Sequence, residues 1–194
     1  MYEFYFDFYN KSSDSNDMNT SPYSSEVFDV VDENDLVIGQ AMRSEVHQQA
    51  LLHRAVHIFA RSEYDQWIIQ KRSSQKDLDP LLLTSSCSGH VDAGEEYRCA
   101  AVRECSEELG VSLKRMDLLE ILRVSPCLET GNEFVRVYLT KHVISPVPNK
   151  EEIFCLEAMN LEQINEKIKK EGELFSKSFL HLFPLVVHIL ERLH

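Results

Sequence analysis

The chain has 194 residues, of which 43% are hydrophobic and 27% charged, and its formal net charge is −12. This length and composition suit one folded domain with a full hydrophobic core. The acidic balance excludes a surface that generally binds nucleic acid, which needs clustered Lys and Arg. No run approaches the roughly 18 apolar residues that cross a membrane. A small anionic substrate is still allowed, because bound cations can reverse the field at a site.

The cysteines and the amino terminus predict a cytoplasmic protein. Five cysteines, an odd number without a CxxC pair, are typical of reduced thiols and not of a disulfide framework or a zinc site. Glu3 and Asp7 stand where a secretory signal would carry positive charge.

Residues 1–25 are predicted to be a flexible tail, and residues 26–194 to be the folded domain. Residues 10–26 are rich in Ser, Asn and Asp, as disordered linkers are. The preceding MYEFYFDFY alternates aromatic residues with acids, which fits either a tail that pads a sheet edge or a peptide that binds a partner. A third hypothesis is that translation starts at Met18, and the mass of the native protein would test it.

The pattern of β-favouring runs predicts strands at 27–31, 36–40, 53–60, 67–72, 84–91, 118–125, 133–144 and 153–158. The first two flank an acidic turn and the next two flank a polar one, so each pair is predicted to form a hairpin. Helices are predicted at about 95–109, at 161–171 and from about residue 176. Asn160 with Gln163 resembles a capping box, and Pro184 marks a new start or a kink in the last helix. Strands with helices before and after them indicate an α/β layered domain.

The most specific pattern is GHVDAGEEYRCAAVRECSEELGV, from Gly89 to Val111. At about 100° per residue, Glu104, Glu107 and Glu108 share an arc of roughly 100° on one helix face. Like charges at these spacings cost a few tenths of a kcal/mol per pair. A hard cation such as Mg²⁺ reverses that cost, because it prefers carboxylate oxygens together with substrate phosphates. A second face, suited to packing on a sheet, carries Ala101, Cys105 and Leu109.

A solvated acidic face is the ordinary explanation of a glutamate cluster that stands alone. Here seven fixed residue types recur at fixed spacing. At a usage of roughly 6% each, they would coincide by chance about once in 10⁸ windows. The pattern therefore carries a function.

This segment is identified as a Nudix box, which it resembles without a gap. The resemblance implies a Nudix α/β/α sandwich with a mixed sheet and a loop-helix-loop. It implies that Glu104, Glu107, Glu108 and the carbonyl of Gly89 bind Mg²⁺ or Mn²⁺. Glu95 would pair with Arg103 to hold the helix in place. Cys105 stands where an aliphatic residue is usual, and we expect it to be a small buried hydrophobe.

The resemblance implies metal-dependent hydrolysis of the diphosphate linkage in a nucleoside diphosphate joined to another group. A bound metal would neutralise phosphate charge and lower the pKa of a water molecule. Glu107 and Glu108 are the favoured positions for ligand and base, and Glu133 on a later strand is an alternative base. The expected partner is a small diphosphate, and a homodimer is an expectation because dimers are common among relatives.

Residues 26–145 resemble the branch related to isopentenyl-diphosphate isomerase. In that isomerase, two histidines before the sheet, a Cys before the Gly-His pair and a Glu-x-Glu build the site. His47, His53 and His90 fall at or near the matching histidine positions. They are predicted either to form a second metal site or to be polar residues beside the sheet.

Two departures favour a hydrolase over an isomerase. Ser88 stands at the thiol position, while Cys87 is one residue early and so on the opposite face of a strand. Gly131 and Glu133 align with the Glu-x-Glu, so one of the two proton carriers is missing. The hydrolase box, by contrast, is intact.

Cations close to the sheet are candidate phosphate ligands. Arg54, Lys71 and Arg72 are the residues concerned, and Lys71 fits a solvated hairpin edge equally well. Arg72 is favoured because relatives carry QKR at this place. A Nudix domain that only binds ligand is a further alternative, and the intact glutamates and Arg103 argue against it.

Overall fold

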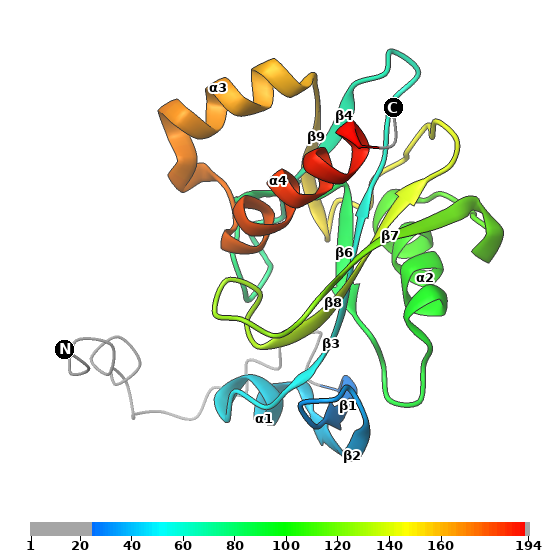
Figure 1. Ribbon diagram of the computed structural model, residues 1–194, viewed down its shortest axis with the longest axis vertical. Helices are drawn as coiled ribbons and strands as arrows, with labels where there is room; N and C mark the ends of the chain where they lie inside the picture. The colour runs from blue at the N-terminus through cyan, green and yellow to red at the C-terminus, as the bar shows by residue number, and fades with distance from the viewer. Residues whose placement is uncertain (1–24, 193–194) are drawn as a thin grey trace.

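A computed structural model describes residues 25–192 and shows an α/β fold of mixed β-structure flanked by helices, as predicted (Figure 1). The strands are β1 (Val27–Val31), β2 (Val37–Met42), β3 (His53–Phe59), β4 (Trp67–Arg72), β5 (Leu83–Thr84), β6 (Cys87–His90), β7 (Leu118–Val124), β8 (Glu133–Thr140) and β9 (Ile153–Met159). The helices are α1 (Arg43–Gln48), α2 (Tyr97–Leu109), α3 (Leu161–Glu171) and α4 (Lys177–Glu191). Short 3₁₀ turns cover Arg115–Asp117 and Gly172–Leu174.

The strands form three sheets. The four-stranded sheet has the order β6-β3-β8-β7, the three-stranded sheet has the order β5-β4-β9, and β1 pairs with β2. Strands β3 and β8 are parallel, and the other pairs are antiparallel. This register places Glu133 beside His53 and places His90 beside Ala55. Residues that are far apart in the sequence thus meet at one end of β3.

Strand β3 separates two hydrophobic clusters. Its side chains alternate between faces, so that Ala55 and Phe59 pack in one cluster, and Val56 and Ile58 in the other. The first cluster contains the buried face of α4, and the second contains the α2 stripe of Ala101, Cys105 and Leu109. Burial on both faces explains why β3 is a nearly continuous apolar run.

Helix α4 begins and packs as an amphipathic helix does. The side chain of Ser176 accepts a hydrogen bond from the Phe179 amide at 3.2 Å and so caps the helix. Phe179 and Phe183 stack with ring centroids 4.9 Å apart, and full burial of such a side chain contributes about 1.5–3 kcal/mol. Pro184 lies inside one continuous helix.

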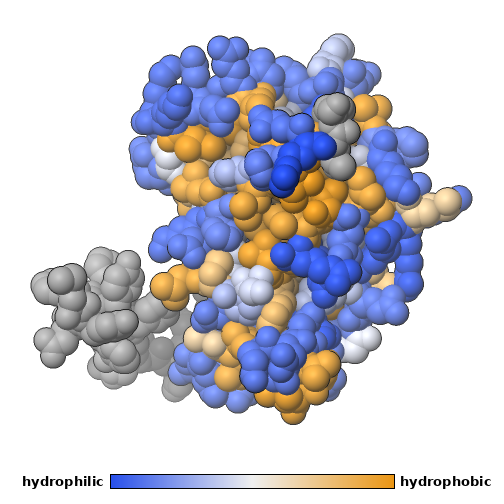
Figure 2. All heavy atoms as spheres, viewed as in Figure 1, coloured by the Kyte–Doolittle hydropathy of each residue, from blue (hydrophilic) through white to orange (hydrophobic). Residues whose placement is uncertain are grey.

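The surface view shows where hydrophobic residues are exposed. Figure 2 shows them in the middle of the viewed face, between α4 and the β7–β8 strands, with hydrophilic residues around them. Three more, Leu36 and the first two residues of β2, Val37 and Ile38, are 50–67% exposed. No helix within residues 25–192 is long and apolar enough to cross a membrane.

Most predicted elements are confirmed, including the first hairpin and the capping box of Asn160 with Gln163. All five cysteines are free, as expected. The second hairpin is present at its turn but does not extend along the strands. The Ser62 amide donates to the Gln66 carbonyl at 2.9 Å, the Ile68 amide donates to the Ala60 carbonyl at 3.0 Å, and Arg61 forms an antiparallel bridge with Trp67. Beyond this turn, β3 and β4 belong to different sheets, because β6 and β8 occupy both edges of β3.

Three smaller features also differ from the predictions. The extended segment 84–91 is divided between β5 and β6. Helix α2 begins at Tyr97, because Gly94 has a φ of +75° and Glu96 is still extended. Helix α1 was not predicted. The predicted tail lies outside the described residues except for Ser25, and so does Met18.

Candidate active site

A cavity of about 640 Å³ is lined by β3, β6, α2, the β7–β8 connection and the first turn of α4. It is strongly acidic: nine carboxylate residues and five Lys or Arg residues line it. The acids are Glu26, Asp79, Asp92, Glu104, Glu107, Glu108, Glu129, Glu133 and Glu152, and the bases are Arg43, Arg72, Lys76, Arg103 and Lys177. An anionic substrate is repelled by such a wall unless cations accompany it.

The three box glutamates lie together on the face of α2 that borders this cavity, as the helical spacing predicted. Their exposure differs sharply. The side chain of Glu107 is 55% exposed, whereas those of Glu104 and Glu108 are only 12% and 2% exposed. One carboxylate is therefore open to solvent, and two face the protein interior.

Glycine is required at position 89 because the carboxylate of Glu104 occupies the space of a side chain. A Cβ at Gly89 would lie 2.0 Å from Glu104 Oε1 and 2.1 Å from its Cδ. Heavy atoms cannot approach that closely. The absence of a side chain thus allows strand β6 and the helix carboxylate to meet.

Glu108 is held by groups from two neighbouring strands. Its Oε2 accepts hydrogen bonds from Gln70 Nε2 at 3.0 Å and from the Ser88 amide at 3.3 Å. Its Oε1 accepts no hydrogen bond from any described residue, and it lies 3.8 Å from Lys76 Nζ. Lys76 also forms an ion pair with Glu152. A buried oxygen with an unused lone pair, directed at the cavity, suits a metal ligand.

Arg103 connects the box residues to each other. Its guanidinium donates to Glu95 Oε2 at 2.9 Å, to Glu104 Oε1 at 2.7 Å and to Glu107 Oε2 at 3.0 Å. A further bond reaches the carbonyl of His90 at 3.0 Å. The predicted contact of Glu95 with Arg103 is thus present. A planar guanidinium with five donors can hold the helix and the end of β6 in one geometry.

Charge and burial shift the ionisation of the two interior carboxyl groups. Burial, then the charge of Glu108, raises the pKa of Glu104 well above its ordinary value despite Arg103. Burial also raises the pKa of Glu108, against the nearby charge of Lys76. Such a pair of oxygen donors is unfavourable as a free dianion and becomes favourable beside a divalent cation. The residues therefore fit Mg²⁺ or Mn²⁺.

The predicted phosphate contacts are only partly placed at this cavity. Arg72 lines it, and its Nε donates to the carbonyl of Leu78 at 3.0 Å. Arg54 is not among the lining residues: its Nε donates to Asp35 Oδ1 at 2.6 Å. Lys71 lies over the ring of Phe154. Arg72 and Lys177 are the lining cations that form no ion pair with a carboxylate of residues 25–192.

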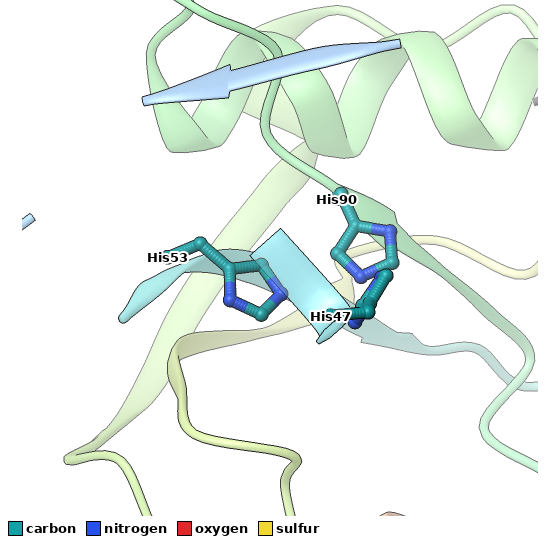
Figure 3. A group of neighbouring side chains, drawn as sticks. All are labelled: His47, His53 and His90. Atoms are coloured by element: carbon teal, nitrogen blue, oxygen red, sulfur yellow. The ribbon is translucent and has the colours of Figure 1, made fainter. Parts of the chain in front are cut away.

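The structure brings the three histidines together next to the box. Figure 3 shows His47, His53 and His90 around a common space. Each can offer a ring nitrogen, and these atoms lie within 4.8 Å of one another. Glu133 Oε1 lies 3.1 Å from His90 Nε2 and 3.5 Å from His53 Nε2. Phe28 stacks on the rings of both His53 and His90 and closes one side. We call this group the histidine pocket.

Hydrogen bonds and burial prepare the histidine pocket for a cation. The carbonyl of Leu51 accepts from His53 Nδ1 at 2.9 Å, so Nδ1 carries a hydrogen and Nε2 faces the pocket. Burial lowers the pKa of His90 to about 4, and burial and His53 lower that of His47. Burial raises the pKa of Glu133, but its contacts with His53 and His90 outweigh this effect and lower the pKa overall. Imidazole nitrogens around an ionised carboxylate are a ligand set that suits a transition metal.

The two residues that bear on isomerase chemistry lie as predicted. Ser88 lines the cavity, whereas Cys87 is fully buried on the other face of β6, in the cluster beneath α2. Burial and a contact with Cys105 raise the pKa of the Cys87 thiol. Cys87 is therefore a core residue, and the cavity receives a hydroxyl where the isomerase has a thiol.

The family model described as NUDIX domain matches residues 51–183, which is more than half of the chain. The chain belongs to the Nudix family. It is 39% identical over 114 residues to an uncharacterized Nudix hydrolase of Nostoc sp., covering 58% of this chain and 68% of that protein. It is 31% identical over 157 residues to an isopentenyl-diphosphate Delta-isomerase of Serratia proteamaculans, covering 80% and 88% of the two chains.

Solved structures give the same assignment. A crystal structure of DR0079 from Deinococcus radiodurans has a TM-score of 0.67 and 31% sequence identity, and the match covers 75% of this chain and 90% of that one. A Nudix hydrolase of the same organism is 32% identical over 145 residues, covering 75% and 85% of the two chains. Together with the complete box, these matches identify the chain as an enzyme of the Nudix hydrolase class.

Several residues of this Nudix site were missed by sequence reasoning. Lys76 and Glu152 reach the box from loops, Arg43 approaches the histidine pocket, and Lys177 comes from the start of α4. His57 is buried behind the cavity wall, with Nδ1 2.9 Å from Ser85 Oγ. A capping serine before an amphipathic helix could have indicated Lys177 as the first residue of that helix. We find no sequence signal for the others.

Proposed function

We propose that this Nudix enzyme is a Mg²⁺- or Mn²⁺-dependent hydrolase that cleaves the diphosphate linkage of a nucleoside diphosphate joined to another group. The observation that carries the proposal is the convergence of Glu104, Glu107 and Glu108 on one acidic cavity, with Glu104 seated against Gly89. Two of these carboxylates are buried without enough positive charge nearby. A hard cation and the phosphates that accompany it supply that charge.

In this proposal the chain's own residues divide the work. Glu104, Glu107, Glu108 and the carbonyl of Gly89 hold the cation. When bound, the cation supplies charge neutralisation at the phosphate oxygens and lowers the pKa of a water molecule. Arg103 and Glu95 fix the positions of the ligands.

Proton transfer falls to Glu107 or Glu108. Glu107 is the more exposed of the two and so is open to water, whereas Glu108 points into the cavity floor. Glu133, the alternative base, is disfavoured because the adjacent histidines lower its pKa. A carboxylate that resists protonation is a poor base.

Arg72 and Lys177 bind substrate phosphate in this proposal. They lie on different parts of the cavity wall and form no ion pair with the described carboxylates. Their charges are therefore available to an anion. A small diphosphate with one group on either side of the linkage would contact both Arg72 and Lys177.

The test is a panel of phosphoanhydrides incubated with Mg²⁺ or Mn²⁺, with released phosphate and monophosphate measured. Nucleoside triphosphates, oxidised nucleotides, nucleotide sugars, dinucleoside polyphosphates, NADH and coenzyme A form the panel. Metal-dependent cleavage of at least one member is expected, with loss of cleavage in Glu107→Gln and normal cleavage in the exposed control Glu162→Gln. No cleavage of any member would reject the hydrolase and favour a binding role.

The isomerase is the second candidate function, and the histidine pocket is the observation that favours it. The same panel should therefore include isopentenyl and dimethylallyl diphosphates. Their interconversion without phosphate release would overturn the proposed hydrolysis. We expect none, because Ser88 and Gly131 replace two groups of the isomerase site.

We also propose that the histidine pocket holds a transition metal as a second cation. Each of His47 and His53 has a buried Nε2 without a hydrogen-bond partner among the described residues. Metal analysis after dialysis at neutral pH should find bound metal in the wild type and in His142→Ala, a control at an exposed histidine. The metal should be lost in His53→Ala. Equal retention in His53→Ala would reject this site.

A homodimer and a cytoplasmic location stay predictions.

A further inference from the structure

A thiol, a carboxylate and an imidazole meet at the side of the cavity where the β7–β8 connection lies beside the first turns of α4 (Figure 1). They belong to Cys127, Glu129 and His181, whose ligand atoms all lie within 4.8 Å of one another. Cys127 and Glu129 are in the connection, and His181 is in α4. This group is separate from the box and from the histidine pocket.

The loop that carries the thiol has a defined shape. The Asn132 amide donates to the carbonyl of Cys127 at 3.0 Å. Thr130 Oγ1 accepts from the Cys127 amide at 3.3 Å and lies 3.4 Å from its Sγ. Bonds within the loop therefore set the position of Cys127, and the exposed side chain of Glu129 lies beside it.

The helix that carries the imidazole is anchored independently. Ser176 caps it and also contacts Thr84 Oγ1 at 3.1 Å. Phe179 and Leu182, on either side of His181 in the sequence, are fully buried. His181 is left half-buried, facing the loop. The segments that carry Cys127 and His181 are thus each held by their own contacts before any ligand binds.

We propose that Cys127, Glu129 and His181 form a zinc site. Thiolate, imidazole and carboxylate are the ligands that Zn²⁺ takes, at about 2.3, 2.0 and 2.0–2.2 Å. Tetrahedral geometry at these lengths places ligand atoms about 3.5 Å apart. Small side-chain rotations would bring the three atoms from their present separations to that value. A water molecule or a substrate oxygen completes the fourth position.

This site would be selective against the cation of the box. Mg²⁺ prefers six oxygen ligands and does not favour thiolate, whereas Zn²⁺ favours sulfur and nitrogen. The two cations can therefore be bound together without exchange between their sites.

The location connects zinc binding to the cavity. Leu128 and Glu129 from the loop line it, and so do Lys177 and Ser178 from the start of α4. Zinc held between Cys127 and His181 would fasten these two segments of the wall to each other. The site thus stabilises the part of the wall that presents Lys177 to the substrate.

Cobalt spectroscopy tests the site without using activity as a readout. Co²⁺ is added to the reduced, metal-free protein in the His53→Ala background, which removes the histidine pocket. A near-ultraviolet thiolate-to-cobalt charge-transfer band that saturates at one equivalent is expected, and one equivalent of Zn²⁺ should abolish it. Cys127→Ser should lose the band and His181→Ala should weaken Co²⁺ binding at least tenfold. Cys155→Ser, a control at another half-buried thiol, should retain both the charge-transfer band and the affinity for Co²⁺.

Three results would overturn the proposal. They are the absence of a thiolate band with folded protein, its persistence in Cys127→Ser, and its loss in Cys155→Ser. Circular dichroism of each variant establishes that the protein is folded. A thermal scan adds a second readout, since Zn²⁺ should raise the Tm of the His53→Ala protein more than that of its Cys127→Ser derivative, in which only the box remains to bind it.

Discussion

Gly89→Ala is expected to damage catalysis while leaving the fold intact. The new Cβ would stand 2.0 Å from Glu104 Oε1, and ordinary van der Waals contact needs 3.4 Å, so the carboxylate must move by about 1.4 Å. A misplacement of about 1 Å at a catalytic site can cost about 10²-fold. The displaced atoms are the far end of a flexible side chain, so the free energy of unfolding should change little.

The assay compares kcat/KM and Tm for Gly89→Ala and for Gly39→Ala. At Gly39, on β2, a Cβ meets nothing within 4 Å. With the best substrate and saturating Mg²⁺, Gly89→Ala should lose about 10²-fold in kcat/KM, and Gly39→Ala should behave as wild type. The proposed role of Gly89 in seating Glu104 is refuted if Gly89→Ala keeps kcat/KM within about threefold of wild type, or if both variants lose activity equally.

Two further predictions concern metal binding and pH. Mg²⁺ at about 100 times its Kd should stabilise the wild type by about 2.7 kcal/mol and raise its Tm by roughly 5–10 °C. EDTA should reverse this shift. An equal Tm shift in Glu108→Gln would contradict the role of Glu108 as a metal ligand. Burial lowers the pKa of His57 from 6.5 to about 4, so at pH values between these the folded state binds fewer protons than the unfolded state. The contribution of neutral His57 to the free energy of unfolding is therefore complete above pH 6.5 and is lost as the pH falls toward 4. At pH 5 the loss is about 2 kcal/mol. Urea unfolding in EDTA measures the drop in the free energy of unfolding between neutral pH and pH 5. This drop should be smaller in His57→Asn than in the wild type by about that amount, and the exposed control His142→Asn should match the wild type.

The local features of the box could be predicted because they depend on helical geometry alone. The spacing of Glu104, Glu107 and Glu108 puts them on one face whatever the rest of the chain does. The same holds for the left-handed Gly110 at the end of α2, which has a φ of +64°. Position on a helix also predicted the burial of Cys105.

What the sequence could not predict was set by pairing between distant strands. Nothing local to β3 shows that β6 and β8 occupy its two edges, so the sequence could not show that the hairpin between β3 and β4 ends at its turn. The same register creates the histidine pocket, because it sets Glu133 beside His53. The resemblance suggested the three histidines as a group, and only the packing showed that their nitrogens converge.

Contacts made by loops were the least predictable part of the site. Arg54 was expected at phosphate, but a turn that is distant in sequence brings Asp35 to its guanidinium. Lys76, conversely, lies in a loop without regular structure and reaches Glu108 and Glu152. Charge in a loop does not show which partner the fold will supply.

The most direct test of the central claim is the turnover of Glu107→Gln with Mg²⁺ on the best substrate of the phosphoanhydride panel. Among residues 25–192, Glu107 forms an ion pair with Arg103 alone, and its side chain is 55% exposed, so the variant should fold with an unchanged Tm. We expect kcat/KM to fall by about 10³-fold or more, since a ligand or base of the reaction is lost. Activity within tenfold of the wild type would contradict the catalytic role of Glu107.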